Sequence, residues 1–313
     1  MLHHLTLKNH RLLSGKIIDV DLSYQIFGKP LQTAPVVLIN HALTGNSDVA
    51  GEKGWWKNLV GENRPLDICN YSILCFNVPG NGFDGKLTDH FQDYTVYDIA
   101  SFFLRGLEFL KIDHVHLLVG GSLGGSVGWE MLSQQPALAN IFIPIACDYK
   151  TTDWLNAQCH VQKFLLNDRD QPLEKARFHA MLCYRTPQSL NERFKNEIHT
   201  EKQIFISHDW LTYHGKSLRQ RFALKAYHLM NHLLTTINVH AKKIQAIKAR
   251  IHLIGIDTDL FFPAQEIKNS YHLLKQNKPD VFYHEVKSIH GHDAFLIEHD
   301  QLNHIINTII HEK

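Results

Sequence analysis

The sequence lacks long apolar runs and a strong charge of either sign, and both absences exclude classes of protein. No apolar stretch approaches the roughly 20 residues that a membrane-spanning helix needs. The formal net charge of the 313 residues is only +1, so no long-range field attracts nucleic acid or an anionic membrane. We therefore expect neither a nucleic acid nor a membrane among the partners.

Cysteine is also scarce, and its spacing indicates neither disulfides nor a metal site. The five cysteines are odd in number and form no C-x-x-C pair, which favours free thiols in a reducing compartment. The 23 histidines are scattered, without an H-E-x-x-H motif or a Cys/His pair at metal-ligand spacing. Residues 1–15 contain no continuous apolar core, so no secretory signal is expected. These features predict a cytoplasmic protein with no metal and no permanently bound cofactor.

What the sequence does contain is the alternation of an α/β fold. Its 44% of hydrophobic and 20% of charged residues are ordinary for a globular protein. Short apolar runs, typical of strands buried on both faces of a parallel sheet, alternate with helical spacing at 95–110, which Thr95 can cap. We predict edge strands within 17–27 and buried strands at 35–40, 71–78, 114–119, 141–146, 250–256 and 281–286.

Between residues 148 and 248 the pattern changes. Helices inserted between core strands are typical of a lid over an active site. The sequence therefore predicts an α/β core of residues 1–147 and 249–313, with a mainly parallel central sheet flanked by helices, and a helical lid insertion of residues 148–248. The lid shows no convincing pair of strands, and its helices are predicted at 173–184, 187–197, 204–213 and 217–234. In the second part of the core we expect helices at 263–275 and 293–313.

The chemistry is expected at Ser122, which Gly120 and Gly124 flank in the spacing G-x-S-x-G. This spacing is typical of a nucleophile elbow, a sharp strand-to-helix turn that exposes the serine hydroxyl. The predicted strand before the motif and the predicted helix after it fit such a turn. For the motif alone, an ordinary glycine-rich turn and a phosphate loop are alternatives.

A serine nucleophile needs a base, and the base needs an acid to orient it. In elbow enzymes these follow in the order Ser, Asp/Glu, His, on loops after core strands. Two later strands are each followed by such residues: Asp257 and Asp259 in the first loop, His290 and His292 in the second. The order fits, and spacing leaves both pairs of candidates open.

The loop at residues 41–45 follows the first buried strand. In an elbow enzyme this loop supplies one backbone N–H of the oxyanion hole, and we assign that donor to Leu43. A plain turn that uses Gly45 is the alternative.

Several segments, in the same order, resemble the homoserine O-acyltransferase family (homoserine O-acetyltransferases) of the α/β-hydrolase fold along nearly the whole chain. The resemblance implies a catalytic triad of Ser122, Asp259 and His292. It also implies that the backbone N–H groups of Leu43 and Leu123 form the oxyanion hole. The segments are residues 41–45, 54–56, 120–125, 184–186, 258–263 and 291–296.

The same resemblance implies that Arg185 and Asp293 bind the acceptor. Homoserine carries a carboxylate and an ammonium group, which need one cation and one anion. Without a substrate role, Arg185 would be a surface charge of the lid and Asp293 a helix cap.

The implied function is transfer of an acetyl group from acetyl-CoA to the hydroxyl of L-homoserine, by a ping-pong route through an acyl-serine, in methionine biosynthesis. Acyl-CoA is then a co-substrate, the partners are small molecules, and the lid helices form a homodimer surface. Succinyl transfer, L-serine as acceptor and a serine esterase are alternatives with the same triad. A non-catalytic binding protein of this fold is a further alternative.

The chain departs from the family in two places. Residues 75–83 read CFNVPGNGF, where the family has a Cys-Pro-Asn-Val-Leu-Gly-like segment, and the region between residues 146 and 184 is shorter than usual. We expect both departures to border the substrate pocket.

Overall fold

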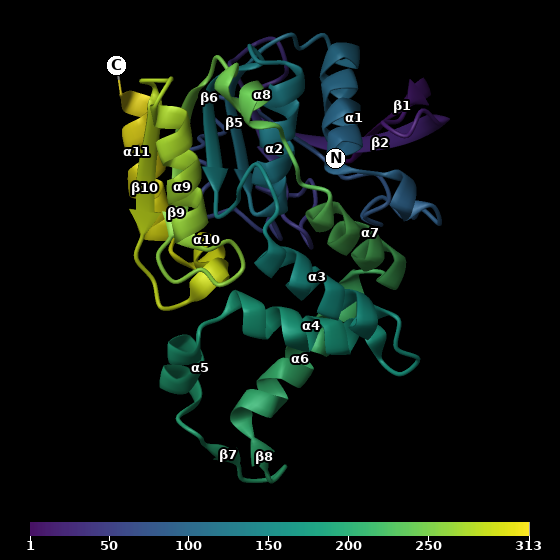
Figure 1. The fold of residues 1–313 in the computed structure, drawn as a ribbon, viewed down its shortest axis with the longest axis vertical. Coiled ribbons are helices and arrows are strands. Elements are labelled where there is room, and N and C mark those ends of the chain that lie inside the picture. The colour runs from purple at the N-terminus through teal and green to yellow at the C-terminus, as the bar shows by residue number, and fades with distance from the viewer. Residues whose placement is uncertain (313) are drawn as a thin grey trace.

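An eight-stranded sheet forms the centre of the computed structural model, which describes residues 1–312 (Figure 1). Its strand order is β1-β2-β4-β3-β5-β6-β9-β10. The pairs β1–β2 and β2–β4 are antiparallel, and all later pairs are parallel. The strands are β1 (His3–Arg11), β2 (Ile17–Gly28), β3 (Val36–Asn40), β4 (Ser72–Phe76), β5 (Val115–Gly121), β6 (Ala139–Ile145), β9 (Arg250–Ile256) and β10 (Val281–Val286).

The central strands are buried on both faces because helices cover the sheet on each side. Successive side chains of a strand point to opposite faces, so Leu38 of β3 joins one apolar cluster and Val37 joins the other. The first cluster includes side chains of α1 (Val96–Phe109), α2 (Leu123–Gln134) and α9 (Ala264–Lys275). The second includes side chains of α10 (Ala294–Ile297) and α11 (His299–His311). The predicted α/β-hydrolase architecture is confirmed.

Two details of the core differ from the sequence prediction. Strand β1 was not expected, because its polar and histidine residues hide the alternation in which Leu5 and Leu7 are buried. The closing helix is not continuous, because the chain changes direction at Glu298, where φ is −82° and ψ is 56°. By contrast, α1 begins where expected, with a capping box between Thr95 and Asp98.

Between β6 and β9 the chain forms a group of helices that lies below the sheet in Figure 1. A short pair of strands, which the sequence did not predict, lies at the far end of this group. The elements of this group are α3 (Asp153–Leu166), α4 (Pro172–Tyr184), α5 (Pro187–Phe194), β7 (Ile198–His199), β8 (Ile204–Phe205), α6 (Ile206–Arg221) and α7 (Leu224–Thr235). The next helix, α8 (Ala241–Gln245), already lies beside the core at the top of Figure 1.

The predicted break between the helices at 204–213 and 217–234 is wrong, since α6 continues through Gly215 and ends at Arg221. Gly215 lies inside the contact of α6 with α4, where a Cβ would be 2.5 Å from the ring of Phe178. This glycine therefore permits a close approach of two helices and does not end one. Helix α8 packs against α2 of the core, and the division at residues 148 and 248 stays a prediction. Within residues 1–312, no helix is both long and apolar enough to cross a bilayer.

The loop after β3 lies directly against the start of α2, and this contact generates a stability prediction. A Cβ at Gly124 would lie 2.1 Å from the carbonyl oxygen of Asn40. Because that atom belongs to the backbone, it cannot move aside cheaply. We expect Gly124→Ala to lower the free energy of unfolding by about 3 kcal/mol or more, measured by urea denaturation.

Gly61→Ala is the matched control, since its Cβ would lie at ordinary contact distances, 3.4 Å from the flexible side chain of Arg64 and 3.6 Å from the carbonyl oxygen of Lys57. We expect this variant to change the free energy of unfolding by less than about 1 kcal/mol. Equal stability of Gly124→Ala and the wild type would contradict the described packing of the elbow.

Candidate active site

Ser122 lies at the turn between β5 and α2, in a conformation that few non-glycine residues adopt. Its φ is 55° and its ψ is −130°, and such strain persists only where the surrounding structure enforces it. The flanking glycines make the turn possible, since a Cβ at Gly120 would lie 2.5 Å from the backbone of Gly124. The flanking glycines therefore allow a serine to keep this strained conformation at the end of a buried strand.

Hydrogen bonds connect this serine to one histidine and one aspartate. The Oγ of Ser122 is 2.9 Å from the Nε2 of His292, and the Nδ1 of His292 is 2.7 Å from the Oδ2 of Asp259. In the neutral tautomer that fits, Nδ1–H donates to Asp259 and Nε2 accepts from the serine hydroxyl. No more than 4% of any of these residues is exposed, so water competes little for the bonds.

Asp259 is held by its own loop. Its Oδ1 accepts hydrogen bonds from the backbone N–H groups of Phe261, at 2.7 Å, and Phe262, at 2.8 Å. With Oδ1 bound in this way, Oδ2 is directed to the imidazole of His292. The loop after β9 thus fixes the orientation of the Asp259 carboxylate, which can then accept a hydrogen bond from His292.

The other two candidates that spacing left open lie outside this chain of hydrogen bonds. Asp257 accepts a hydrogen bond from the backbone N–H of Ser288. The Nδ1 of His290 is 2.8 Å from the Oγ of Ser189 in α5. Both residues therefore support the loop that carries His292.

Aromatic side chains enclose the imidazole of His292. The ring centroids of Tyr184, Phe261, Phe262 and Phe295 lie 5.1–5.7 Å from that of His292. Tyr184 belongs to α4, so the inserted helices complete this enclosure. The sequence did not single out Tyr184 for this contact, although it lies in one of the segments that carry the family resemblance.

Two backbone segments converge on the elbow as possible donors to an oxyanion. Leu123 is the first residue of α2, where a backbone N–H has no acceptor within the helix. Leu43 lies in the loop after β3, which touches the start of α2 through Asn40 and Gly124. The structure therefore places Leu123 at the elbow and brings the start of the loop that carries Leu43 against it.

His41 fixes the loop that carries Leu43, a role that sequence reasoning missed. Its Nδ1 is 2.8 Å from the carbonyl of Ala42, and its Nε2 accepts the backbone N–H of Val78 at 3.0 Å. Burial lowers the pKa of His41 to about 4, so the ring stays neutral and keeps Nε2 as an acceptor at neutral pH. The sequence did contain a signal for this role, since His41 is a histidine that directly follows a predicted buried strand.

Arg185 and Asp293, predicted to bind the acceptor, form an ion pair with each other. The Nε of Arg185 is 3.0 Å from the Oδ2 of Asp293, with only 12% and 15% of the side chains exposed. The Nη1 of Arg185 also contacts His290 and Ser189. Among residues 1–312, these contacts leave Nη2 of Arg185 and Oδ1 of Asp293 without a protein partner, next to His292.

The segment in which the chain departs from the family connects the core to the inserted helices. Asn77 binds the backbone N–H of Ser47 through its Oδ1 at 2.8 Å, and Gly80 faces Leu229 of α7. Among residues 1–312, no three His, Cys, Asp or Glu side chains are grouped so that they could hold a metal ion.

Comparison with known proteins places this geometry in a class. Residues 35–143 match the family model for the alpha/beta hydrolase fold. The chain therefore has the α/β-hydrolase fold that its sequence predicted.

In sequence the chain is similar to homoserine O-acetyltransferases, and the resemblance stated from the sequence is confirmed. That of Salinibacter ruber is 29% identical over 97% of this chain and 94% of its own length. That of Cyclobacterium marinum is also 29% identical, over 87% of this chain and 84% of its own length.

Solved structures agree on the fold. Homoserine O-acetyltransferase from Staphylococcus aureus superposes with a TM-score of 0.84 and 23% identity, covering 100% of this chain and 96% of its own. An acetylester hydrolase from Corynebacterium glutamicum superposes with a TM-score of 0.83 and 17% identity over the same shares. A shared fold therefore does not distinguish transfer to an alcohol from transfer to water.

A second buried carboxylate, Asp148, lies just beyond β6. Its Oδ1 accepts from the hydroxyl of Ser270 and from the backbone N–H of Tyr149, both at 2.7 Å. Its Oδ2 has no hydrogen-bond partner among residues 1–312. Burial raises the pKa of Asp148 from 3.8 to about 7, although these hydrogen bonds and the charge of Lys150 act in the opposite direction.

This raised pKa makes the stability depend on pH. Below about pH 3.8 the carboxyl is protonated in both states. As the pH rises from there through about 7, the unfolded chain gives up its proton first, and the folded state loses stability. We expect Asp148→Asn to reduce this loss, so that its melting temperature rises relative to the wild type between about pH 4 and pH 7.

Asp153→Asn, at an exposed position of α3, is the control that should follow the wild type. A melting temperature of Asp148→Asn that stays at a constant offset from the wild type across this range would contradict the assigned protonation.

Proposed function

We propose that the protein is an acetyltransferase that moves an acetyl group from acetyl-CoA to the hydroxyl of L-homoserine, in methionine biosynthesis. The hydrogen-bonded series Ser122, His292 and Asp259 carries the proposal, because it supplies the nucleophile, base and acid of covalent acyl transfer. The names of the relatives support homoserine as the acceptor.

In the first half-reaction, His292 removes the proton of the Ser122 hydroxyl while Oγ attacks the thioester carbonyl. The tetrahedral intermediate collapses to an acyl-serine. The thiol of CoA leaves with the proton from the imidazolium. Asp259 holds His292 in the tautomer that presents Nε2 to the serine and stabilises the imidazolium.

In the second half-reaction, the hydroxyl of homoserine gives its proton to His292, and its oxygen attacks the acyl-serine. Collapse releases the ester and returns the proton to Oγ of Ser122. At each tetrahedral stage, backbone N–H groups of Leu43 and Leu123 bind the oxyanion. Each such donor is worth about 3 kcal/mol.

Homoserine needs a cation for its carboxylate and an anion for its ammonium group, and we assign Arg185 and Asp293 to these roles. Their ion pair next to His292 supports the assignment, because the pair presents one charge of each sign to a zwitterion. The Nη2 of Arg185 and the Oδ1 of Asp293 remain for the ligand. Asp293 directly follows the proposed base, so a ligand bound there lies close to Nε2.

Water must be kept from the acyl-serine, since hydrolysis competes with transfer. The aromatic enclosure of His292 and the low exposure of Ser122 support a dry site, with small molecules as the partners and no resident cofactor. We also propose that the enzyme acts in the cytoplasm, in agreement with its free cysteines.

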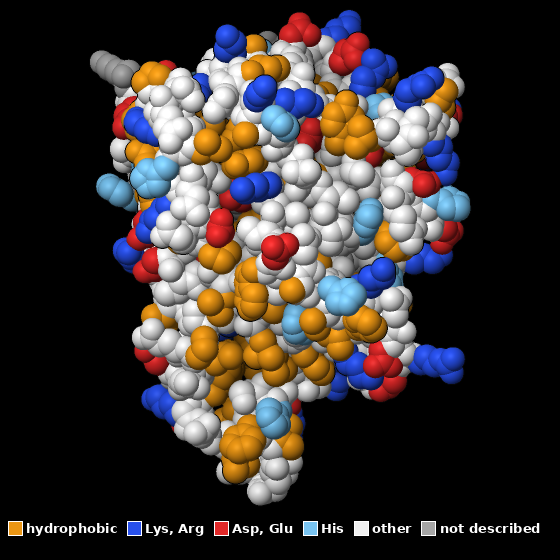
Figure 2. All heavy atoms as spheres, viewed as in Figure 1, with side chains coloured by type: hydrophobic (Ala, Val, Ile, Leu, Met, Phe, Trp, Pro, Cys, Tyr) orange, Lys and Arg blue, Asp and Glu red, His pale blue; other side chains and the backbone are white. Residues whose placement is uncertain are grey.

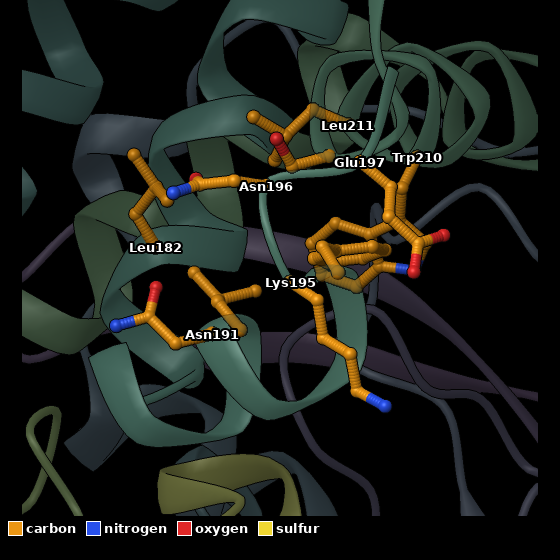
Figure 3. Close-up of a pocket in the computed structure, with 10 residues that line it drawn as sticks. Leu182, Asn191, Lys195, Asn196, Glu197, Trp210 and Leu211 are labelled. Carbon is orange, nitrogen blue, oxygen red and sulfur yellow. The ribbon is translucent and has the colours of Figure 1, made fainter. Parts of the chain in front are cut away.

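A homodimer through the inserted helices is part of the proposal. Hydrophobic side chains gather over these helices in Figure 2, and a hollow of about 200 Å³ opens between α5, α6 and the end of α4. Figure 3 shows Trp210 and Leu211 of α6 lining it, with Leu182 and Asn191 opposite. The exposed apolar residues of this region include Trp154, Val161, Phe164, Leu182, Ile198, Ile204, Phe205 and Tyr213.

An esterase is the second candidate function. The observation that favours it is the close superposition with the acetylester hydrolase, which shows that this fold also serves hydrolysis. Succinyl-CoA as donor and L-serine as acceptor are variants of the transferase.

The release of free CoA from acetyl-CoA distinguishes these functions. We expect L-homoserine to accelerate the release and L-serine to do so less. We expect Ser122→Ala to lower the homoserine-dependent rate by about 10⁴-fold or more. Ser133→Ala, at the other end of α2, removes a hydroxyl that is bonded only to Glu130 and should keep the rate within about threefold.

A rate of CoA release that is the same with and without homoserine would identify an esterase and overturn the transferase. A fully active Ser122→Ala variant would overturn both functions.

A further inference from the structure

Two arginines of the inserted helices have no acidic partner, although each contacts a residue that borders the active site. Arg185 pairs with Asp293, and Arg219 pairs with Glu174 at 3.0 Å. Among residues 1–312, no carboxylate lies within salt-bridge distance of Arg177 in α4 or of Arg221 at the end of α6. These two charges are therefore not neutralised by the protein.

Contacts place both guanidinium groups beside the active site. The Nη1 of Arg221 donates to the carbonyl of Thr44 at 3.0 Å, one residue beyond Leu43. The guanidinium carbon of Arg177 lies 5.8 Å from the centre of the Tyr184 ring. That ring lies 5.4 Å from the imidazole of His292. One arginine thus touches the loop of a proposed oxyanion donor, and the other lies one aromatic ring away from the proposed base.

The two charges also influence each other and their neighbours. The pKa of Arg221 is lowered by burial of its guanidinium and then by the charge of Arg177, although the residue as a whole is exposed. Burial and the surrounding guanidinium groups, that of Arg177 first, lower the pKa of His214 in α6 to about 4. The Nε of Arg177 is buried and has no partner among residues 1–312, which costs free energy unless a ligand accepts its hydrogen bond.

We propose that Arg177 and Arg221 bind an anionic group of the acyl donor, either a phosphate of its CoA part or a carboxylate at the far end of its acyl chain. The inference rests on the proposed function, because it takes the donor to be an acyl thioester of CoA. A guanidinium presents a planar fork of N–H donors that fits the oxygens of either group.

Equilibrium binding tests the proposal without any acceptor or turnover. Every chain in this test, including the one called wild type, carries Ser122→Ala, so that the thioester of S-succinylpantetheine cannot acylate the protein. Isothermal titration of the full chain with three ligands separates the two sources of negative charge. CoA carries phosphates, S-succinylpantetheine carries only a carboxylate, and pantetheine carries neither. The variants are Arg177→Gln and Arg221→Gln, and Lys216→Gln, which removes an exposed charge of α6, is the control.

If a phosphate is bound, each arginine variant weakens the binding of CoA by about tenfold or more and leaves the binding of S-succinylpantetheine unchanged. If a carboxylate is bound, each arginine variant weakens the binding of S-succinylpantetheine by about tenfold or more and leaves the binding of CoA unchanged. In both cases, the affinity for pantetheine stays the same, and Lys216→Gln binds all three ligands as the wild type does.

Unchanged affinities for both charged ligands would overturn the proposal, and so would an equal loss for pantetheine, since the arginines would then only support the helices. A wild type that binds neither charged ligand would overturn it as well. The proposed function is tested separately, by whether homoserine accelerates the release of CoA. Failure of the arginine site can therefore be distinguished from failure of the proposed function.

Discussion

The hydrogen bond between Ser122 and His292 is the interaction on which the rest of the structure depends. It requires a serine held at a positive φ, which the surrounding glycines and the packed loop after β3 make possible. It also requires a histidine on a loop that follows the last strand of the sheet, far away along the chain. The parallel sheet supplies this meeting point, because the carboxyl ends of its strands lie at one edge.

The inserted helices complete the site chemically as well as sterically. Tyr184 covers the imidazole, and Arg185 forms an ion pair with the residue after the proposed base. The same helices bring Arg221 to the carbonyl of Thr44 and Arg177 to the ring of Tyr184, without acids to balance their charges. A site that combines this triad, one balanced ion pair and two cations without acidic partners is suited to a zwitterionic acceptor and an anionic donor.

Much of this site could be predicted from the sequence, because each triad residue follows a predicted strand, and the three residues come in the order that elbow enzymes use. Ser122 was identified by its glycines, and the acid and base by their position after two later strands. Spacing could not choose between Asp257 and Asp259, since the choice depends on which carboxylate the loop turns inward. Nor could it predict that Arg185 contacts Asp293, a tertiary pairing. The break expected near Gly215 was wrong because that glycine serves helix packing.

The most direct test of the account is the mass of the intact protein after brief exposure to acetyl-CoA. The account predicts one acetyl group per chain, located on the peptide that contains Ser122, which is lost on addition of L-homoserine as O-acetylhomoserine appears. An adduct on another residue, or an adduct that water removes as fast as homoserine does, would contradict it.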